Sequence, residues 1–108
     1  MRKLDLSSYN VTDKVIGGDG EVIEVTAPYN VKDSVINVLF MPAVGLQGAA
    51  LIRQNMLAMK IEASKDGFVI LEEEEYQRVK SAAELFKAPS RAHVEFIDRI
   101  LNKTPEVD

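Results

Sequence analysis

The sequence has 108 residues, 13 Lys and Arg against 17 Asp and Glu, and a formal net charge of -4 at pH 7. That length suits one domain, and 46% hydrophobic residues with so little net charge exclude a wholly disordered chain. The acidic balance argues against a general nucleic-acid binder, which needs clustered lysine and arginine to neutralise phosphates.

The first elements in chain order form a predicted β-hairpin. Residues 10–16 and 21–27 are rich in β-branched side chains, and Gly17-Gly18-Asp19-Gly20 lies between them. Glycine adopts positive φ angles at little steric cost, so we expect Gly18 to do so in this loop. Apolar and polar residues do not alternate cleanly, which leaves the strand register and the buried face open. We expect Pro28 to end the second strand.

Two helices and a short strand are predicted next. Asn30 can cap a helix over residues 31–40, because its side-chain oxygen can accept a hydrogen bond from a free amide of the first turn. A second helix is predicted over residues 46–63. The short apolar run at 68–71 then predicts a third strand.

The last third of the chain predicts two further helices, over residues 72–87 and 90–102. We expect Pro89 to stop the first of them and the polar end, residues 103–108, to be frayed. No internal repeat or linker divides the chain, so the prediction is one α+β domain over all 108 residues. The expected apolar stripe of the last helix is Val94, Ile97 and Leu101.

The chain contains no cysteine, which excludes disulfides and thiolate chemistry and is compatible with a reducing compartment. No apolar run reaches about 18 residues, so we expect no membrane span. The N-terminal segment Met1-Arg2-Lys3-Leu4-Asp5 has no apolar signal core. We therefore expect a cytoplasmic protein rather than a secreted one.

No motif in the sequence frames a catalytic, cofactor-binding or metal site. The glycine cluster is followed by a β-branched run, whereas a phosphate-binding loop needs a following helix. His93 is the only histidine, and no acid lies at a recognised ligand spacing from it. No serine stands in a nucleophile motif. We therefore expect a protein that is not an enzyme and that uses no cofactor or metal.

Four successive carboxylates form the densest charge run and are one candidate contact with a basic partner. The alternative is a helix start, because acids in the first turn complement the positive end of the helix dipole. The residues of this run are Glu72, Glu73, Glu74 and Glu75.

A basic strip along the last helix is a second candidate contact, with phosphate or with an acidic partner. The alternative is a solvated face, on which Arg99 pairs with Glu95 one helical turn away. The residues of the expected strip are Arg91, Arg99 and Lys103.

The helix over residues 46–63 carries more apolar surface than one contact with a core consumes. Ile52, Met56 and Met59 share one side of it, and other apolar residues point in further directions. One interpretation is a central helix, buried between the hairpin and the other helices. We favour a protein interface, most simply with a second copy of the chain, because flexible methionines suit adaptable contact surfaces.

Besides the hairpin, three segments are informative together: Tyr-Asn-Val-Lys-Asp-Ser-Val at 29–35, Leu-Glu-Glu-Glu-Glu-Tyr at 71–76 and His-Val-Glu-Phe-Ile-Asp-Arg-Ile-Leu at 93–101. In this order the segments resemble small accessory proteins encoded by tailed phages and prophages. The resemblance implies a binding or assembly factor without catalytic residues. We therefore expect a non-enzymatic protein-interaction module that associates with itself. The alternative is an accessory nucleic-acid-associated protein that uses the basic strip.

Overall fold

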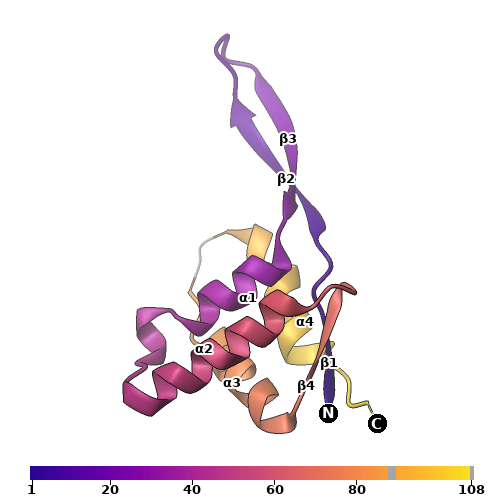
Figure 1. The fold of residues 1–108 in the computed structure, drawn as a ribbon. Coiled ribbons are helices and arrows are strands. Elements are labelled where there is room, and N and C mark those ends of the chain that lie inside the picture. Colours follow the sequence, from indigo (N-terminus) through magenta and orange to yellow (C-terminus); the bar gives the residue numbers. More distant parts are fainter. Residues whose placement is uncertain (88–89, 108) are drawn as a thin grey trace.

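The computed structural model describes residues 1–87 and 90–107, and over these residues the chain forms four strands and four helices (Figure 1). The predicted α+β class is confirmed. Two single 3-10 turns, η1 (Pro42–Val44) and η2 (Arg91–His93), precede the second and fourth helices. The main elements in chain order are β1 (Arg2–Asp5), β2 (Tyr9–Ile16), β3 (Val22–Tyr29), α1 (Val31–Leu39), α2 (Gly48–Ala63), β4 (Phe68–Leu71), α3 (Glu73–Glu84) and α4 (Val94–Asn102).

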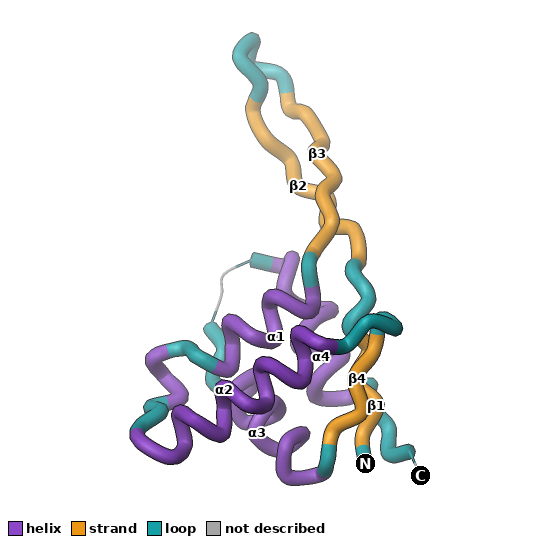
Figure 2. Tube along the Cα trace, viewed as in Figure 1, coloured by secondary structure: helices purple, strands orange, loops and turns teal. Residues whose placement is uncertain are grey.

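The strands form two separate antiparallel pairs, β1 with β4 and β2 with β3. The β1–β4 pair lies beside the helices and, with them, makes the body of the molecule. The β2–β3 hairpin projects from this body as a long arm, which Figure 2 shows in orange above the helices. The arm accounts for the elongated dimensions of 52 × 31 × 23 Å.

The hydrophobic core lies in the body, between the helices and the β1–β4 pair. Each of the four helices buries one apolar side, as periodic sequences predict. On α4, the predicted stripe was wrong at Val94, which is largely exposed, and it missed the fully buried Phe96 and Ile100. The other two predicted residues, Ile97 and Leu101, are partly buried against the core. The largest fully buried side chains are Phe96, Leu4, Leu39, Leu57, Ile61, Leu71, Ile100, Val31, Val35 and Val79.

Local capping signals account for where the helices begin. The Asn30 side chain accepts a hydrogen bond of 3.0 Å from the Asp33 backbone N–H, which confirms the predicted cap of α1. Glu72 and Glu75 form a reciprocal capping box at the start of α3. Helix α3 then ends at Glu84, before the predicted residue 87.

Two features at the start of the chain differ from the prediction. Strand β1 was not predicted, because Leu4 is the single apolar residue among charged neighbours, yet Leu4 is fully buried and pairs with Val69. Pro28 does not end β3, which continues to Tyr29. Proline is tolerated there because β3 pairs with β2 alone among the described strands.

Residues 104–107 are docked rather than frayed as predicted. The Thr104 hydroxyl is buried and donates to the Arg99 carbonyl over 2.8 Å. Beyond it, the Lys3 N–H donates to the Pro105 carbonyl and the Val107 N–H donates to the Met1 carbonyl, over 3.0 and 2.8 Å. The tail therefore lies along the edge of β1. The predicted helix stop at Pro89 lies outside the described residues.

The glycine loop closes the arm, but the expected role of Gly18 was wrong. In this loop the positive φ angle belongs to Gly20, at 83°. The Gly17 N–H donates to the Glu21 carbonyl over 2.8 Å, and the Gly20 N–H donates to the Gly17 carbonyl over 3.0 Å. The conformational freedom of glycine is therefore needed at the fourth loop residue rather than the second.

We predict that Gly20→Val frays the tip of the arm, whereas Gly18→Val does not. A valine at positive φ costs about 1–2 kcal/mol, because its Cβ crowds the backbone. A Cβ added at Gly18 meets no atom within 4 Å. Amide exchange of Gly17, whose N–H donates to the Glu21 carbonyl, should accelerate in the Gly20 variant alone when it is measured by NMR. Equal exchange in the two variants would contradict the assignment.

Candidate functional site

Large exposed apolar side chains gather at two places, on the arm and on the outer side of α2. Single exposed apolar residues are ordinary, but neighbouring ones mark surfaces that bind a partner. Those of the arm are Val15, Ile16, Val22, Ile23 and Val25, and those of α2 are Leu51, Ile52, Met56 and Met59.

The strand register gives the arm two faces, one mainly apolar and one mainly polar except near the tip, where the exposed Ile16 and Val22 lie on it. Residues two apart on a strand lie on the same face. Each odd-numbered residue of β2 pairs with an odd-numbered residue of β3, so the odd-numbered residues of both strands share one face. On the opposite face the Thr12 and Thr26 hydroxyls share a hydrogen bond of 2.9 Å, and Lys14 lies across from Glu24. We call the apolar side the arm face: Val11, Val15, Ile23, Val25 and Ala27.

The arm is also acidic. It carries four carboxylates and one lysine, and in the described structure none of them forms an ion pair. Asp13 lies on the same side as the arm face. At the tip, the Asp19 carboxylate accepts a hydrogen bond of 3.1 Å from the Glu21 N–H. The arm therefore presents apolar side chains together with uncompensated negative charge.

Helix α2 has two apolar sides, of which one is buried and one is exposed. Leu57 and Ile61 lie in the core, whereas Ile52, Met56 and Met59 are 65%, 65% and 58% exposed. The interpretation of a central, fully buried helix was therefore wrong. The exposed apolar positions recur after three and four residues alternately, the spacing of a helix that packs along one seam. We call them the α2 outer face: Ala49, Ile52, Met56, Met59 and Ala63.

Two basic side chains border the α2 outer face on the side of α3. Arg53 and Lys60 both line a shallow groove between the two helices. The Lys60 ammonium pairs with the Glu75 carboxylate over 2.7 Å, and Arg53 is exposed without an ion pair among the described residues. Three glutamates from the start of α3 and Arg78 line the same groove, so its charges largely balance. Arg53 is therefore the cation of this border that is left without an ion pair in the described structure.

Stacked aromatic rings fasten the root of the arm to the body. The rings of Tyr9 and Tyr29 lie 4.8 Å apart and nearly parallel. Burial raises the pKa of Tyr9, whose hydroxyl donates to the Ala92 carbonyl over 2.7 Å and accepts from the Phe96 N–H over 3.2 Å. The Tyr29 hydroxyl shares a hydrogen bond of 2.6 Å with Nδ1 of His93. The structure thus supplies the histidine with a partner that no sequence motif indicated.

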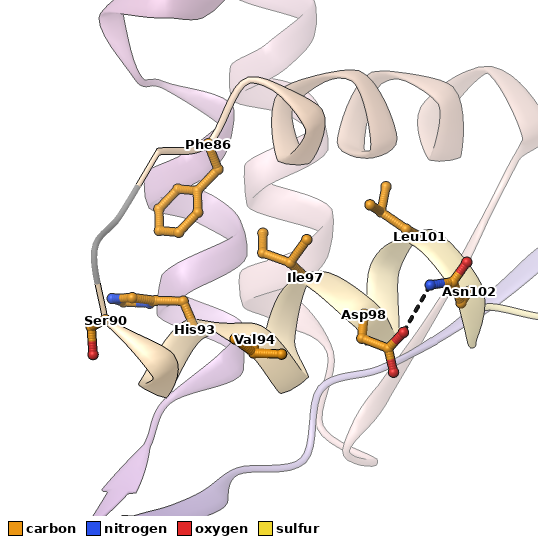
Figure 3. Close-up of a pocket in the computed structure, with 8 residues that line it drawn as sticks. All are labelled: Phe86, Ser90, His93, Val94, Ile97, Asp98, Leu101 and Asn102. Carbon is orange, nitrogen blue, oxygen red and sulfur yellow. Dashed lines mark hydrogen bonds between the residues drawn. The ribbon is translucent and has the colours of Figure 1, made fainter. Parts of the chain in front are cut away.

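A hollow of about 380 Å³ opens beside His93, between the end of α3 and α4 (Figure 3). Its Asp98 carboxylate accepts a hydrogen bond of 2.8 Å from Asn102 and pairs with Lys103, which together lower its pKa. In the figure Val94 and Ile97 lie between His93 and Asp98, so these two groups do not form a catalytic pair. The apolar lining of the hollow is Phe86, Val94, Ile97 and Leu101.

The expected basic strip of the last helix is not a continuous exposed surface. Arg99 is only 8% exposed, and its guanidinium donates to the carbonyls of Asp5 and Ser7 over 3.2 and 2.7 Å. Lys103 pairs with Asp98 over 3.1 Å, which leaves Arg91 exposed by itself. Sequence periodicity placed Arg99 on a helix surface but could not show that β1 and the link to β2 cover it.

The four carboxylates at the start of α3 are engaged within the chain. Glu72 and Glu75 cap the helix, Glu73 pairs with Arg2 over 3.0 Å, and Glu74 pairs with Arg78 over 3.0 Å. A hydrogen bond from Arg2 holds the pKa of Glu73 below its ordinary value. The structure therefore favours the helix-start interpretation of this run over a free acidic contact surface.

Within residues 1–87 and 90–107, no group of three His, Asp or Glu side chains is placed to hold a metal ion. None of the helices described here has the length and apolar character needed to cross a membrane. Comparisons with protein-family models, with curated proteins and with solved structures gave no match. The arm and the α2 outer face remain as the two places where large apolar side chains gather on the described surface.

We predict that Arg99→Leu destabilises the protein by about 2–3 kcal/mol, because two carbonyls lose a charged donor in a covered site. Urea unfolding should show the loss as a lower midpoint. Arg91→Leu is the matched control, because Arg91 is exposed, and its midpoint should stay within about 0.5 kcal/mol of the wild type. Equal losses in both variants would contradict the structural role of Arg99.

We also predict a loss of stability in acid that depends partly on Lys60. Burial acts to raise the pKa values of Asp5 and Glu75, but hydrogen bonds from Ser7 and Lys60 outweigh it, so both pKa values are lowered by folding. Such carboxylates stabilise the fold above their unfolded pKa, near 4, and lose this contribution as the pH falls through the folded pKa.

The unfolding free energy should therefore stay level from pH 7 to about 5 and decline below about 4. Lys60→Met should make that decline shallower, because the pKa of Glu75 is no longer held down. Urea titrations at successive pH values measure the slope. Lys65→Met is the control, since Lys65 is exposed and forms no ion pair among the described residues. A slope unchanged by the Lys60 substitution would contradict the role of this ion pair.

Proposed function

We propose that this protein is a small non-enzymatic module for protein–protein contact or assembly, and that the arm is its contact element. The observation that supports this most is that an apolar face lies exposed on a two-stranded arm projecting from the body (Figure 1). A two-stranded hairpin without further packing is marginally stable in water. Its apolar face therefore gains stability when a partner covers it.

Packing of the body does not explain why the arm is rich in apolar residues. Residues 10–28 are absent from the hydrophobic core and from the partly buried residues packed against it. Tyr9 and Tyr29, at the root, do pack against the core. Isoleucines and valines at the far end therefore add nothing to the packing of the body. A binding role explains why they are apolar.

The α2 outer face supports the same class of function. A helix that carries apolar residues at a regular spacing on its solvent side is suited to a second contact. Self-association is therefore part of the proposal. The resemblance of the hairpin and the three later segments to accessory proteins of tailed phages agrees with an assembly role, and the cysteine-free composition suits a cytoplasmic setting.

The geometry supports the nucleic-acid alternative less well. Of the three expected basic residues, Arg99 is buried and Lys103 pairs with Asp98. Affinity for duplex DNA depends on the number of phosphates that free cations neutralise. We therefore expect weak binding of duplex DNA at physiological salt.

We predict that shortening the arm abolishes partner binding while the body stays folded. Replacing residues 14–24 with Asn-Gly joins Asp13 to Val25, which are paired in the register, through a favourable two-residue turn. No core residue is removed, so the helical circular dichroism should be retained. Chemical cross-linking and light scattering should show the wild-type contacts, with this chain or with another protein, lost from the shortened form.

Leu85→Ser is the matched control, because Leu85 is an exposed apolar residue at the end of α3, away from the arm. It should keep every partner that the wild type binds. A partner that binds the shortened form as tightly as the wild type would show that the arm is not the contact element.

A further inference from the structure

We infer that the arm of one copy binds the α2 outer face of a second copy, in a head-to-tail contact. This inference rests on the proposed function and names the partner of the arm. The chain exposes two apolar surfaces of different shape: one lies on a pair of strands that carries acidic side chains, and the other lies on a helix that is bordered by a basic side chain.

Charge favours this pairing over the alternatives. Among the described residues, the arm carboxylates Asp13, Asp19 and Glu21 form no ion pair. On the border of the α2 outer face, Lys60 is neutralised by its own ion pair, and Arg53 is the exposed cation without one in the described structure. Opposite charges around an apolar contact steer two surfaces together and set their orientation. Two arms would instead bring like charges together, and such pairs across neighbouring strands are destabilising.

The arm face is short enough to lie within the α2 outer face. The arm face extends over about 13 Å from Val11 to Val15, at the rise of a strand. The α2 outer face extends over about 21 Å from Ala49 to Ala63, at the rise of a helix. Met56 and Met59 have flexible side chains that can fill the space between β-branched residues. A strand pair laid on this helix would therefore cover both apolar surfaces at once.

The contact has to be made between molecules. The arm points away from the helices in the view of Figure 1, and the stacked tyrosines at its root hold it there. Its own α2 outer face is thus out of reach of its tip. Because the two surfaces differ, each bound copy still offers one free arm and one free helix face. A contact of this kind continues until it closes into a ring or extends as a filament.

Two variants that each remove one surface test this geometry. Ile23→Asp places a charge on the arm face, and Met56→Glu places one on the α2 outer face. Both side chains are exposed in the single molecule, so both variants should fold and keep the helical circular dichroism of the wild type. Val15→Asp and Ile52→Glu serve as second choices if either fails to fold.

Light scattering should show wild-type mass that increases with concentration beyond that of a dimer. Each variant alone should be monomeric, or should associate at least tenfold more weakly. Mixed together, they should form one heterodimer and nothing larger, because the Met56 variant supplies an intact arm and the Ile23 variant an intact helix face. Arg53→Glu should also weaken association about tenfold, while Lys65→Glu, outside the α2 outer face, should not.

Three results would overturn the inference. A wild type that is monomeric at millimolar concentration has no such contact. If the wild type assembles but the two variants do not form a heterodimer on mixing, the contact joins two identical surfaces instead. A monomeric wild type that binds a different protein through its arm leaves the arm standing as the contact element, and it removes self-association and the second copy as the partner. The proposed function itself fails if the shortened arm retains every partner.

Discussion

The stacked pair Tyr9 and Tyr29 is the joint on which the rest of the structure depends. A hairpin of this length is marginal by itself, so its base must be fixed by tertiary contacts. Here the two hydroxyls reach the backbone of the segment before α4 and the ring of His93, while Arg99 lies over the Tyr9 ring at 5.5 Å. These bonds set the direction in which the arm leaves the body.

The direction of the arm determines which apolar surfaces stay exposed. Had the hairpin folded back over α2, its isoleucines and the methionines of that helix would have formed an ordinary core. Because the joint holds the arm away, both surfaces remain uncovered in one molecule and become available to another. The body keeps a complete core of its own, so the arm can act as a contact element without weakening the fold.

Features set by neighbouring residues were predictable from the sequence. Asn30 capping α1, the acidic start of α3 and the hairpin around the glycine loop all depend on groups within a few residues of one another. The exposed side of α2 was predictable for the same reason, because helical periodicity alone brings Ile52, Met56 and Met59 together. The sequence therefore indicated one of the two candidate contact surfaces, and it left the register of the other open.

Features that join distant parts of the chain required the tertiary structure. Tyr29 meets His93 across 64 residues, and Arg99 reaches the Ser7 carbonyl across 92. Strand β1 forms because distant residues of β4 pair with it, and the tail docks through backbone hydrogen bonds with Met1 and Lys3. By itself the sequence determined the helices, the hairpin and the apolar side of α2 that stays exposed, since these follow from local spacing. Only the tertiary structure decided which sides are covered, because burial depends on partners that no local pattern specifies.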